Sequence, residues 1–182
     1  MKNATTALKL FLCMTVITGI FYPLVVWAGA QALFKGKAEG SLVRVNGVVA
    51  GSGLVGQKFS RPEYFWPRPS ATGYDPMPSG GSNLSLTSAQ LGAAVKERRK
   101  GFVRAEVPAD LLFASGSGLD PHISPDAALI QCDRVAAARG VSKGDIIYLV
   151  NTVTEQRQAG FLGEPRVNVL LLNLILDGKY LK

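Results

Sequence analysis

The stretch that decides the architecture runs from Leu10 to Phe34 and reads LFLCMTVITGIFYPLVVWAGAQALF. Its 25 consecutive residues carry no formal charge. As a helix they would reach about 37 Å at about 1.5 Å per residue, which is enough to cross a bilayer with some tilt. The sequence therefore predicts a short leader over residues 1–9 and one transmembrane helix over residues 10–34. Pro23, near the middle of this helix, is expected to kink it.

A cleaved secretory signal is the alternative interpretation of the same stretch. Lys2 and Lys9 precede the apolar run, and Ala28-Gly29-Ala30 offers small residues of the kind found at cleavage sites. The apolar run is, however, longer than the roughly 7 to 15 residues of a signal core. We therefore favour an uncleaved span.

The direction of insertion does not follow from the charges beside the span. Lys2 and Lys9 lie before it, whereas Lys35, Lys37 and Arg44 follow it, which is nearly a tie under the positive-inside rule. The short leader and the signal-like layout favour a cytoplasmic N-terminus and an exported, periplasmic domain.

The remaining residues, 35–182, are expected to form one soluble domain, since 148 residues can bury a sizeable core. They carry 18 basic and 13 acidic side chains, a balance that is basic but is not a signature of nucleic-acid binding. Cys13 lies in the apolar run and Cys132 is the only cysteine of the domain, so an internal disulfide and a cysteine zinc site are both excluded there.

The first part of the domain is expected to hold a small sheet and an irregular segment. Between residues 41 and 59, Asn46-Gly47 separates two short apolar segments, which is a strong signal for a β-hairpin. Residues 60–86 contain five prolines and lack helical periodicity. Their aromatic residues favour an ordered segment that packs on the rest of the domain rather than a flexible linker.

The second part is expected to be helical, with four helices marked by capping residues or terminal glycines. The stretch IIYLV in the third of them would also suit a strand, because it is rich in β-branched and aromatic residues. Strands followed by helices indicate an α+β domain with a small sheet and several helices. The four expected helices run from Thr87 to Gly101, from Ser124 to Gly140, from Ser142 to Val153 and from Asn168 to Gly178.

His122 is the only histidine, and Asp120, Ser115 and Ser117 lie close to it in the sequence. This grouping invites the hypothesis of a membrane-anchored envelope hydrolase. A nucleophile, a base and an orienting carboxylate within eight residues would need an unusual loop, and the GxSxG elbow is absent. A loop in which these side chains bond to the backbone is the more ordinary interpretation. The residues show no spacing typical of a zinc or calcium site.

Two further stretches suggest binding. Ser79-Gly80-Gly81-Ser82-Asn83 is a glycine-rich turn whose backbone amides could hold a phosphate, although it lacks the lysine and the spacing of a P-loop. Residues 96–100, KERRK, form a basic cluster that could meet anionic lipid or an acidic partner, or could simply be a solvated helix face.

Several segments, taken together and in this order, resemble the C subunit of the bacterial Kdp potassium-transporting P-type ATPase complex. The resemblance covers nearly the whole chain, span included. The motifs that carry it are Gly56-Gln57, Tyr64-Phe65, Arg68-Pro69-Ser70-Ala71, Ser79-Gly80-Gly81-Ser82-Asn83, residues 114–124 (ASGSGLDPHIS), residues 163–169 (GEPRVNV) and Leu172-Asn173.

The resemblance implies a non-catalytic accessory subunit of the bacterial inner membrane, which supports ATP-coupled potassium uptake. Its partners would be the channel-like potassium-binding subunit, the P-type ATPase subunit and membrane lipid, with no nucleic acid. ATP and potassium would be handled by the complex, and no cofactor would be held firmly by this chain. The candidates for contacts with a partner or a nucleotide are Arg68, Ser79, Gly80, Gly81, Ser82, Asn83, Ser115, Asp120 and His122.

One alternative within this resemblance concerns the nucleotide. The family subunit is described as raising the ATP affinity of the catalytic subunit, which would make Ser79 to Asn83 a direct nucleotide contact on the cytoplasmic side. An exported domain would never meet cytoplasmic ATP, so we expect docking on the channel-like subunit instead.

Overall fold

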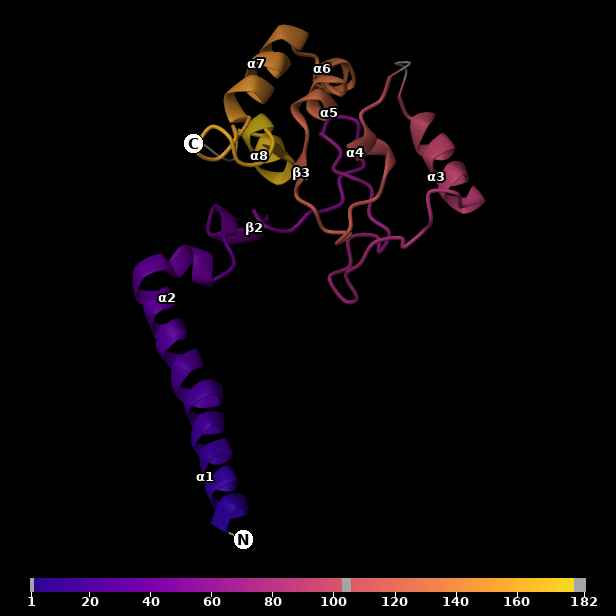
Figure 1. Ribbon diagram of the computed structural model, residues 1–182. Helices are drawn as coiled ribbons and strands as arrows, with labels where there is room; N and C mark the ends of the chain where they lie inside the picture. Colours follow the sequence, from indigo (N-terminus) through magenta and orange to yellow (C-terminus); the bar gives the residue numbers. More distant parts are fainter. Residues whose placement is uncertain (1, 103–105, 179–182) are drawn as a thin grey trace. The chain divides into compact units, whose positions relative to one another are not determined.

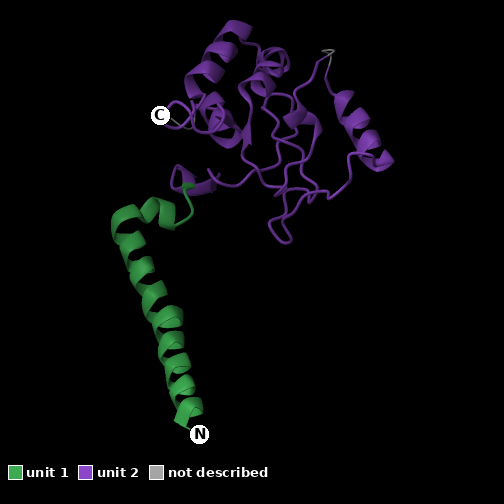
Figure 2. Cartoon of the chain, in the orientation of Figure 1, with its two compact units in different colours: residues 1–42 green, residues 43–182 purple. Residues whose placement is uncertain are grey.

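The computed structural model describes residues 2–102 and 106–178. The chain divides into two compact units, Met1–Leu42 and Val43–Lys182 (Figure 2). The first is a long helix, and the second is a domain of short helices, small antiparallel sheets and ordered loops (Figure 1). This architecture confirms the expected α+β class.

The helical unit consists of α1 (Lys2–Val16), a π-helical turn η1 (Ile17–Phe21) and α2 (Tyr22–Ala38). Pro23 stands in the first turn of α2, directly after the widened turn. Because proline lacks an N–H and crowds the preceding turn, a π-helical turn is one way to keep the helix continuous past it. The sequence led us to expect a kink at Pro23, but the non-helical backbone angles lie at Phe34, with φ −139° and ψ 41°.

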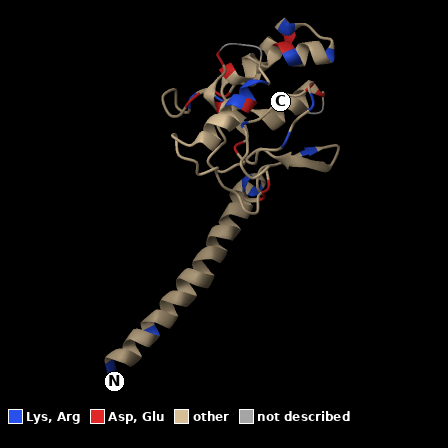
Figure 3. Ribbon diagram, turned by 90° about the vertical axis from the view of Figure 1, so that its right-hand side faces the viewer, with Lys and Arg blue, Asp and Glu red and all other residues tan. Residues whose placement is uncertain are grey.

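This helix has the composition of a membrane span. Residues Lys2–Leu33 are helical, and the most apolar 18-residue window within them has a mean hydropathy of 2.1 and is not buried within the protein. The helix begins at Lys2, so residues 2–9 of the expected leader are helical as well. Figure 3 shows a long stretch of uncharged residues between the charged residues near its two ends. By length and composition the helix can cross a membrane.

The second unit begins with the expected hairpin, formed by β1 (Leu42–Val45) and β2 (Val48–Ser52). Asn46 and Gly47 both have positive φ, of 50° and 80°, as a tight two-residue turn requires. Residues 60–86 contain no helix or strand, and several side chains of the helical half hold them in place.

Gln131 and two arginines fix this irregular segment. The Gln131 Oε1 accepts from the Trp66 N–H at 2.8 Å, and its Nε2 donates to the Trp66 carbonyl at 3.1 Å. The guanidinium of Arg134 lies 3.6 Å from the centroid of the Trp66 ring, and Arg139 Nε donates to the Glu63 carbonyl at 2.7 Å. The aromatic segment is therefore packed on the domain, as expected.

Six helices occupy the rest of the described residues, and three of them begin at capping residues that the sequence predicted. Ser124, Ser142 and Asn168 each accept a hydrogen bond from a backbone N–H of the helix that follows. The cap of the first helix is Ser88 rather than the expected Thr87. The helices are α3 (Ala89–Arg99), α4 (Ala109–Leu112), α5 (Pro125–Leu129), α6 (Cys132–Arg139), α7 (Lys143–Val153) and α8 (Val169–Leu176).

The single helix expected from Ser124 to Gly140 is wrong, because the chain breaks between α5 and α6. In a continuous helix the backbone N–H of Gln131 would bond to the Ala127 carbonyl. Instead the side-chain Nε2 of Gln131 takes that carbonyl at 3.0 Å, and the backbone N–H bonds to Ala128. The side-chain amide of Gln131, which also bonds to the backbone of Trp66, thus replaces a helical hydrogen bond at the break. Gly140, with φ 66°, ends α6 as expected.

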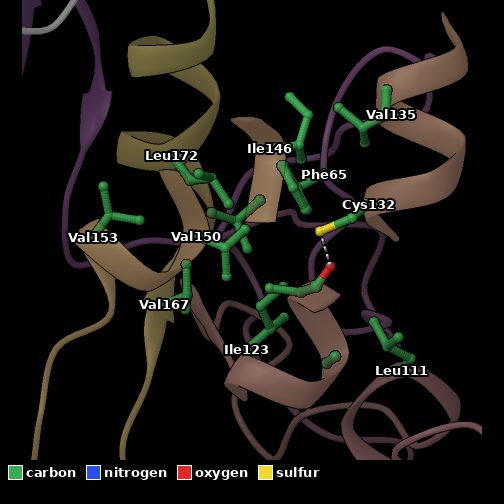
Figure 4. Packing of buried hydrophobic residues seen from close by; sticks show 14 residues of the cluster. Phe65, Leu111, Ile123, Cys132, Val135, Ile146, Val150, Val153, Val167 and Leu172 are labelled. Atoms are coloured by element: carbon green, nitrogen blue, oxygen red, sulfur yellow. Dashed lines mark hydrogen bonds between the residues drawn. The ribbon is translucent and has the colours of Figure 1, made fainter. Parts of the chain in front are cut away.

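The core lies among α5, α6, α7 and α8 and includes the fully buried ring of Phe65 (Figure 4). On α5 and α6, a buried apolar stripe is formed by Ala128, Cys132, Val135 and Ala136. The thiol of Cys132 donates a hydrogen bond to the Ala128 carbonyl at 3.5 Å.

A second small sheet joins two segments that are far apart in the sequence. Strand β3 (His122–Ile123) pairs antiparallel with β4 (Val167–Asn168), His122 opposite Asn168 and Ile123 opposite Val167. This pairing was not expected from the sequence, because two-residue strands carry no periodicity. It sets the position of the only histidine.

Candidate functional site

Two glycine-containing loops meet at van der Waals distance in the second unit. Gly118 has φ +71°, and a Cβ placed on it would lie 2.8 Å from the Gly80 carbonyl oxygen. A Cβ on Gly81 would lie 3.1 Å from the carbonyl oxygen of Gly116. The backbones of residues 79–83 and 115–118 therefore approach each other more closely than side chains would allow.

The loop 68–74 lies against the same place. The N–H of buried Ser115 donates to the Pro69 carbonyl at 3.1 Å, and the hydroxyl of Ser70 accepts from the N–H groups of Thr72 and Tyr74. The phenol of Tyr74 donates to the Arg68 carbonyl at 2.8 Å. We call the three segments 68–74, 79–83 and 115–122 together the loop surface.

Arg68, Asp120 and His122 form the charged centre of the loop surface. Arg68 Nη1 lies 3.0 Å from one carboxylate oxygen of Asp120, and the backbone N–H of His122 donates to the other oxygen at 3.0 Å. The Nδ1 atom of the His122 ring lies 3.7 Å from the same carboxylate. Three residues that the resemblance singled out are thus brought together across 52 residues of sequence.

The environment of Asp120 favours its charged form. Burial alone would raise the pKa of this carboxyl, but the side chain and backbone N–H of His122, together with the hydrogen bond and charge of Arg68, outweigh burial. The net effect lowers the pKa of Asp120 from 3.8 to about 2. Asp120 is therefore a carboxylate throughout the physiological pH range.

A pocket of about 390 Å³ opens beside this centre. The β3–β4 pair positions it, since one strand supplies His122 and the chain enters the other through Glu164 to Arg166. Its lining carries both carboxylates and guanidinium groups. The pocket is lined by Arg68, Asp110, Asp120, His122, Ile123, Ser124, Glu164, Pro165 and Arg166.

The turn from Ser79 to Asn83 contributes to the loop surface without lining the pocket. Ser79, Ser82 and Asn83 are exposed, whereas Gly80 and Gly81 are half-buried against the neighbouring loop. The helix that follows begins only after its cap at Ser88. The turn therefore does not lie at the N-terminus of α3, where the helix dipole would favour a phosphate.

The serines near His122 have structural roles. Ser115 is 3% exposed, and the Ser117 hydroxyl accepts from the Leu119 N–H at 3.1 Å. No hydrogen bond within residues 2–102 and 106–178 joins a serine hydroxyl to the His122 ring. The same residues contain no group of three His, Cys, Asp or Glu side chains that could hold a metal ion. Among the described residues, the surroundings of His122 therefore do not show the nucleophile-to-base contact that a serine hydrolase uses.

Some residues of the site were not predicted as site residues. Tyr74 holds the backbone of Arg68, and burial, only partly opposed by the charge of Arg98, raises the pKa of its phenol to about 12. Glu164 and Arg166 line the pocket from the other side. Both belong to the GEPRVNV motif, which marked them as residues of interest. The sequence did not indicate that this motif lies next to Arg68, Asp120 and His122.

Comparison with known proteins agrees with these motifs. Residues 4–178 match the family model of KdpC, described as the c chain of the K⁺-transporting ATPase. The "Potassium-transporting ATPase KdpC subunit" of Leptospira interrogans is 49% identical, covering 96% of this chain and 93% of that protein. The proteins of the same name from Geobacter sulfurreducens and Sorangium cellulosum are 50% and 53% identical, covering 97% and 94% of this chain and 98% and 95% of theirs.

A family model that spans nearly all of the chain, and relatives about half identical over nearly their whole length, confirm the resemblance: the chain belongs to the KdpC family, the c chain of K⁺-transporting ATPases.

Proposed function

We propose that this protein is a non-catalytic accessory subunit that stabilises the assembly of the channel-like potassium-binding subunit with the P-type ATPase subunit. Membership of the family makes the chain a subunit of a K⁺-transporting ATPase. Within that complex, the other subunits hydrolyse ATP and bind potassium, and this chain docks on them.

The loop surface is the observation that carries this proposal. Its three segments are locked by the close approaches at Gly81 and Gly118, so it is preorganised rather than flexible. Its central ion pair is only partly exposed, with 28% of the Arg68 side chain and 30% of the Asp120 side chain accessible. The buried Nε of Arg68 has no hydrogen-bond partner within the described residues. A rigid surface with partly buried charges suits specific docking on a complementary protein face.

The proposed topology is a single pass through the bacterial inner membrane, with the N-terminus in the cytoplasm and the second unit in the periplasm. The long uncharged stretch of the helix, residues 10–34, and the short basic segment before it support this assignment. In this arrangement the loop surface would dock on the channel-like subunit on the outer side. An effect of this chain on ATP turnover would then be transmitted through its partners.

The docking role is tested by Arg68→Ala in the complete complex. The substitution removes the cation that pairs with Asp120, so we expect weaker co-purification of the other subunits and an unchanged fold. Lys143→Ala is the matched control, because it breaks a 2.6 Å ion pair with Asp133 outside the loop surface. Normal complex yield together with normal potassium uptake in Arg68→Ala would contradict the proposal.

The topology is tested separately by labelling. A single cysteine at Phe161, which is 72% exposed, is placed in a background that lacks Cys13 and Cys132. We expect a membrane-impermeant maleimide to label it in intact cells. Labelling only after lysis would place the domain in the cytoplasm and would return Ser79 to Asn83 to consideration as a nucleotide contact.

A further inference from the structure

The hairpin that opens the second unit, together with the turn that follows it, exposes apolar side chains that the other described residues leave uncovered. Val48 is 72% exposed, Leu54 is 61% exposed, and Val49 and Val55 are 45% and 37% exposed. We call these four residues the hairpin patch. Single apolar residues on a surface are ordinary, but four exposed ones within eight positions are a local concentration, which is typical of an interaction site.

The far end of the hairpin is fixed to the domain. Asn168 Nδ2 donates to the Gly53 carbonyl at 2.8 Å, and Gln57 Nε2 donates to the Ala50 carbonyl at 3.3 Å. A Cβ on Gly51 would lie 2.9 Å from a methyl group of Leu170. The hairpin patch therefore lies on a segment that hydrogen bonds and packing hold to the domain, not on a flexible loop.

The connection from the long helix to the hairpin is short. Eight residues, 34–41, separate the apolar helix from β1, and backbone hydrogen bonds tie Glu39 to Lys35 and Ser41 to Gly36. Helical residues rise about 1.5 Å each and extended ones about 3.5 Å, so this connection spans about 20 Å at most. A hairpin on such a tether stays close to the headgroups of a bilayer that the helix crosses.

Basic residues accompany the patch. Lys35, Lys37, Arg44 and Lys58 are all exposed, and Glu39 is the one acidic residue between positions 35 and 58. Apolar side chains flanked by lysine and arginine are the composition of segments that lie in a membrane interface and prefer anionic lipids.

We infer that the hairpin patch inserts into the interfacial region of the bilayer, as a second and shallower membrane contact of this chain next to its span. The patch supplies apolar side chains to the acyl boundary, and the basic residues meet anionic headgroups. This contact holds whichever side of the membrane carries the domain, but it rests on the proposed membrane span.

Single-cysteine variants of the full chain, labelled with the environment-sensitive fluorophore NBD and reconstituted alone in nanodiscs of phosphatidylcholine and phosphatidylglycerol, test this inference. The cysteine replaces Val48 in a Cys13→Ser, Cys132→Ala background. Tyr148→Cys is the matched control, because Tyr148 is 74% exposed and lies on α7, at the other end of the same unit (Figure 1). Native Cys13, labelled in a Cys132→Ala chain, reports on the span itself.

We expect the label at position 48 to be blue-shifted, to be quenched by lipids with a shallow spin label, and to be quenched by aqueous iodide about three-fold less than the label at position 148. Replacing phosphatidylglycerol by phosphatidylcholine, or making Arg44→Glu and Lys58→Glu together, should reduce this protection. Equal iodide quenching at positions 48 and 148 would overturn the inference. Protection at position 48 that arises only after the other subunits are added would also overturn it, and would assign the patch to a protein partner.

The label at Cys13 separates the two proposals. Deep quenching at position 13 with an aqueous signal at position 48 would reject the hairpin contact and leave the span intact. An aqueous signal at position 13 would reject the span and the hairpin contact together.

Discussion

The side-chain amide of Asn173 forms two hydrogen bonds with the backbone of Phe65, as a neighbouring strand would. Its Oδ1 accepts from the Phe65 N–H at 2.8 Å, and its Nδ2 donates to the Phe65 carbonyl at 3.0 Å. Both residues are buried, at 1% and 0% exposure. A helix side chain thus satisfies the backbone of an irregular segment from which the Phe65 ring enters the core.

Asn173→Leu should lower the free energy of unfolding by about 2–4 kcal/mol, because it leaves a buried N–H and a buried carbonyl without partners. Thermal unfolding of the full chain in detergent, followed by circular dichroism, measures the change. Asn151→Leu is the control, since Asn151 is exposed on α7. Equal stability of the two variants would show that the amide bonds contribute little.

Gly118→Ala should destabilise the protein more than Gly163→Ala. Both glycines have positive φ, of 71° and 77°, so alanine is strained at either position by about 1–2 kcal/mol. At Gly118 the new Cβ would also lie 2.8 Å from the Gly80 oxygen and from the Thr72 hydroxyl, whereas nothing lies within 4 Å at Gly163. Urea unfolding of the two variants should therefore differ by about 1–3 kcal/mol, the cost of overpacking. Matching midpoints would argue against the tight packing of the loop surface.

The ion pair of Asp120 should make stability depend on pH in the acid range. The folded pKa of about 2 lies below the unfolded value of 3.8, so the unfolded state binds more protons between these two pH values. The stabilisation is complete above about pH 4 and is lost as the pH falls towards 2. Unfolding of the wild type and of Asp120→Asn should therefore differ most above pH 4 and converge near pH 2. Glu106→Gln, at an exposed position, controls for the change in net charge. A difference that stays constant from pH 2 to pH 6 would contradict the lowered pKa.

The phenol of Tyr74 should lose its proton at a higher pH than an exposed tyrosine does. Burial raises its pKa to about 12, against 10.0 for an exposed phenol, so the unfolded state loses this proton first. The contribution of Tyr74 to stability is therefore present below pH 10 and is lost as the pH rises from 10 to 12. The ultraviolet titration of the wild type minus that of Tyr74→Phe should show one phenolate appearing near pH 12. A step near pH 10 in that difference would show that Tyr74 is solvated.

Features governed by neighbouring residues were predictable from the sequence. The long apolar helix needs only a run of apolar residues, the hairpin needs Asn46-Gly47, and the caps need a polar residue at the start or a glycine at the end. For this reason α7 and α8 were predicted with nearly correct ends. The motif resemblance also identified the family, and with it Arg68, Asp120 and His122 as candidates.

Features that depend on contacts across the chain were decided only by the tertiary structure. Gln131 breaks a helix whose local signals are continuous, because its amide is needed at Trp66, 65 residues away. The β3–β4 pair joins residues 122–123 to 167–168, and no periodicity marks such short strands. The sequence by itself determined which residues could form helices, turns and caps, since those preferences act over a few positions. Which loops meet, and which charges face one another, depended on the free energy of packing the whole domain.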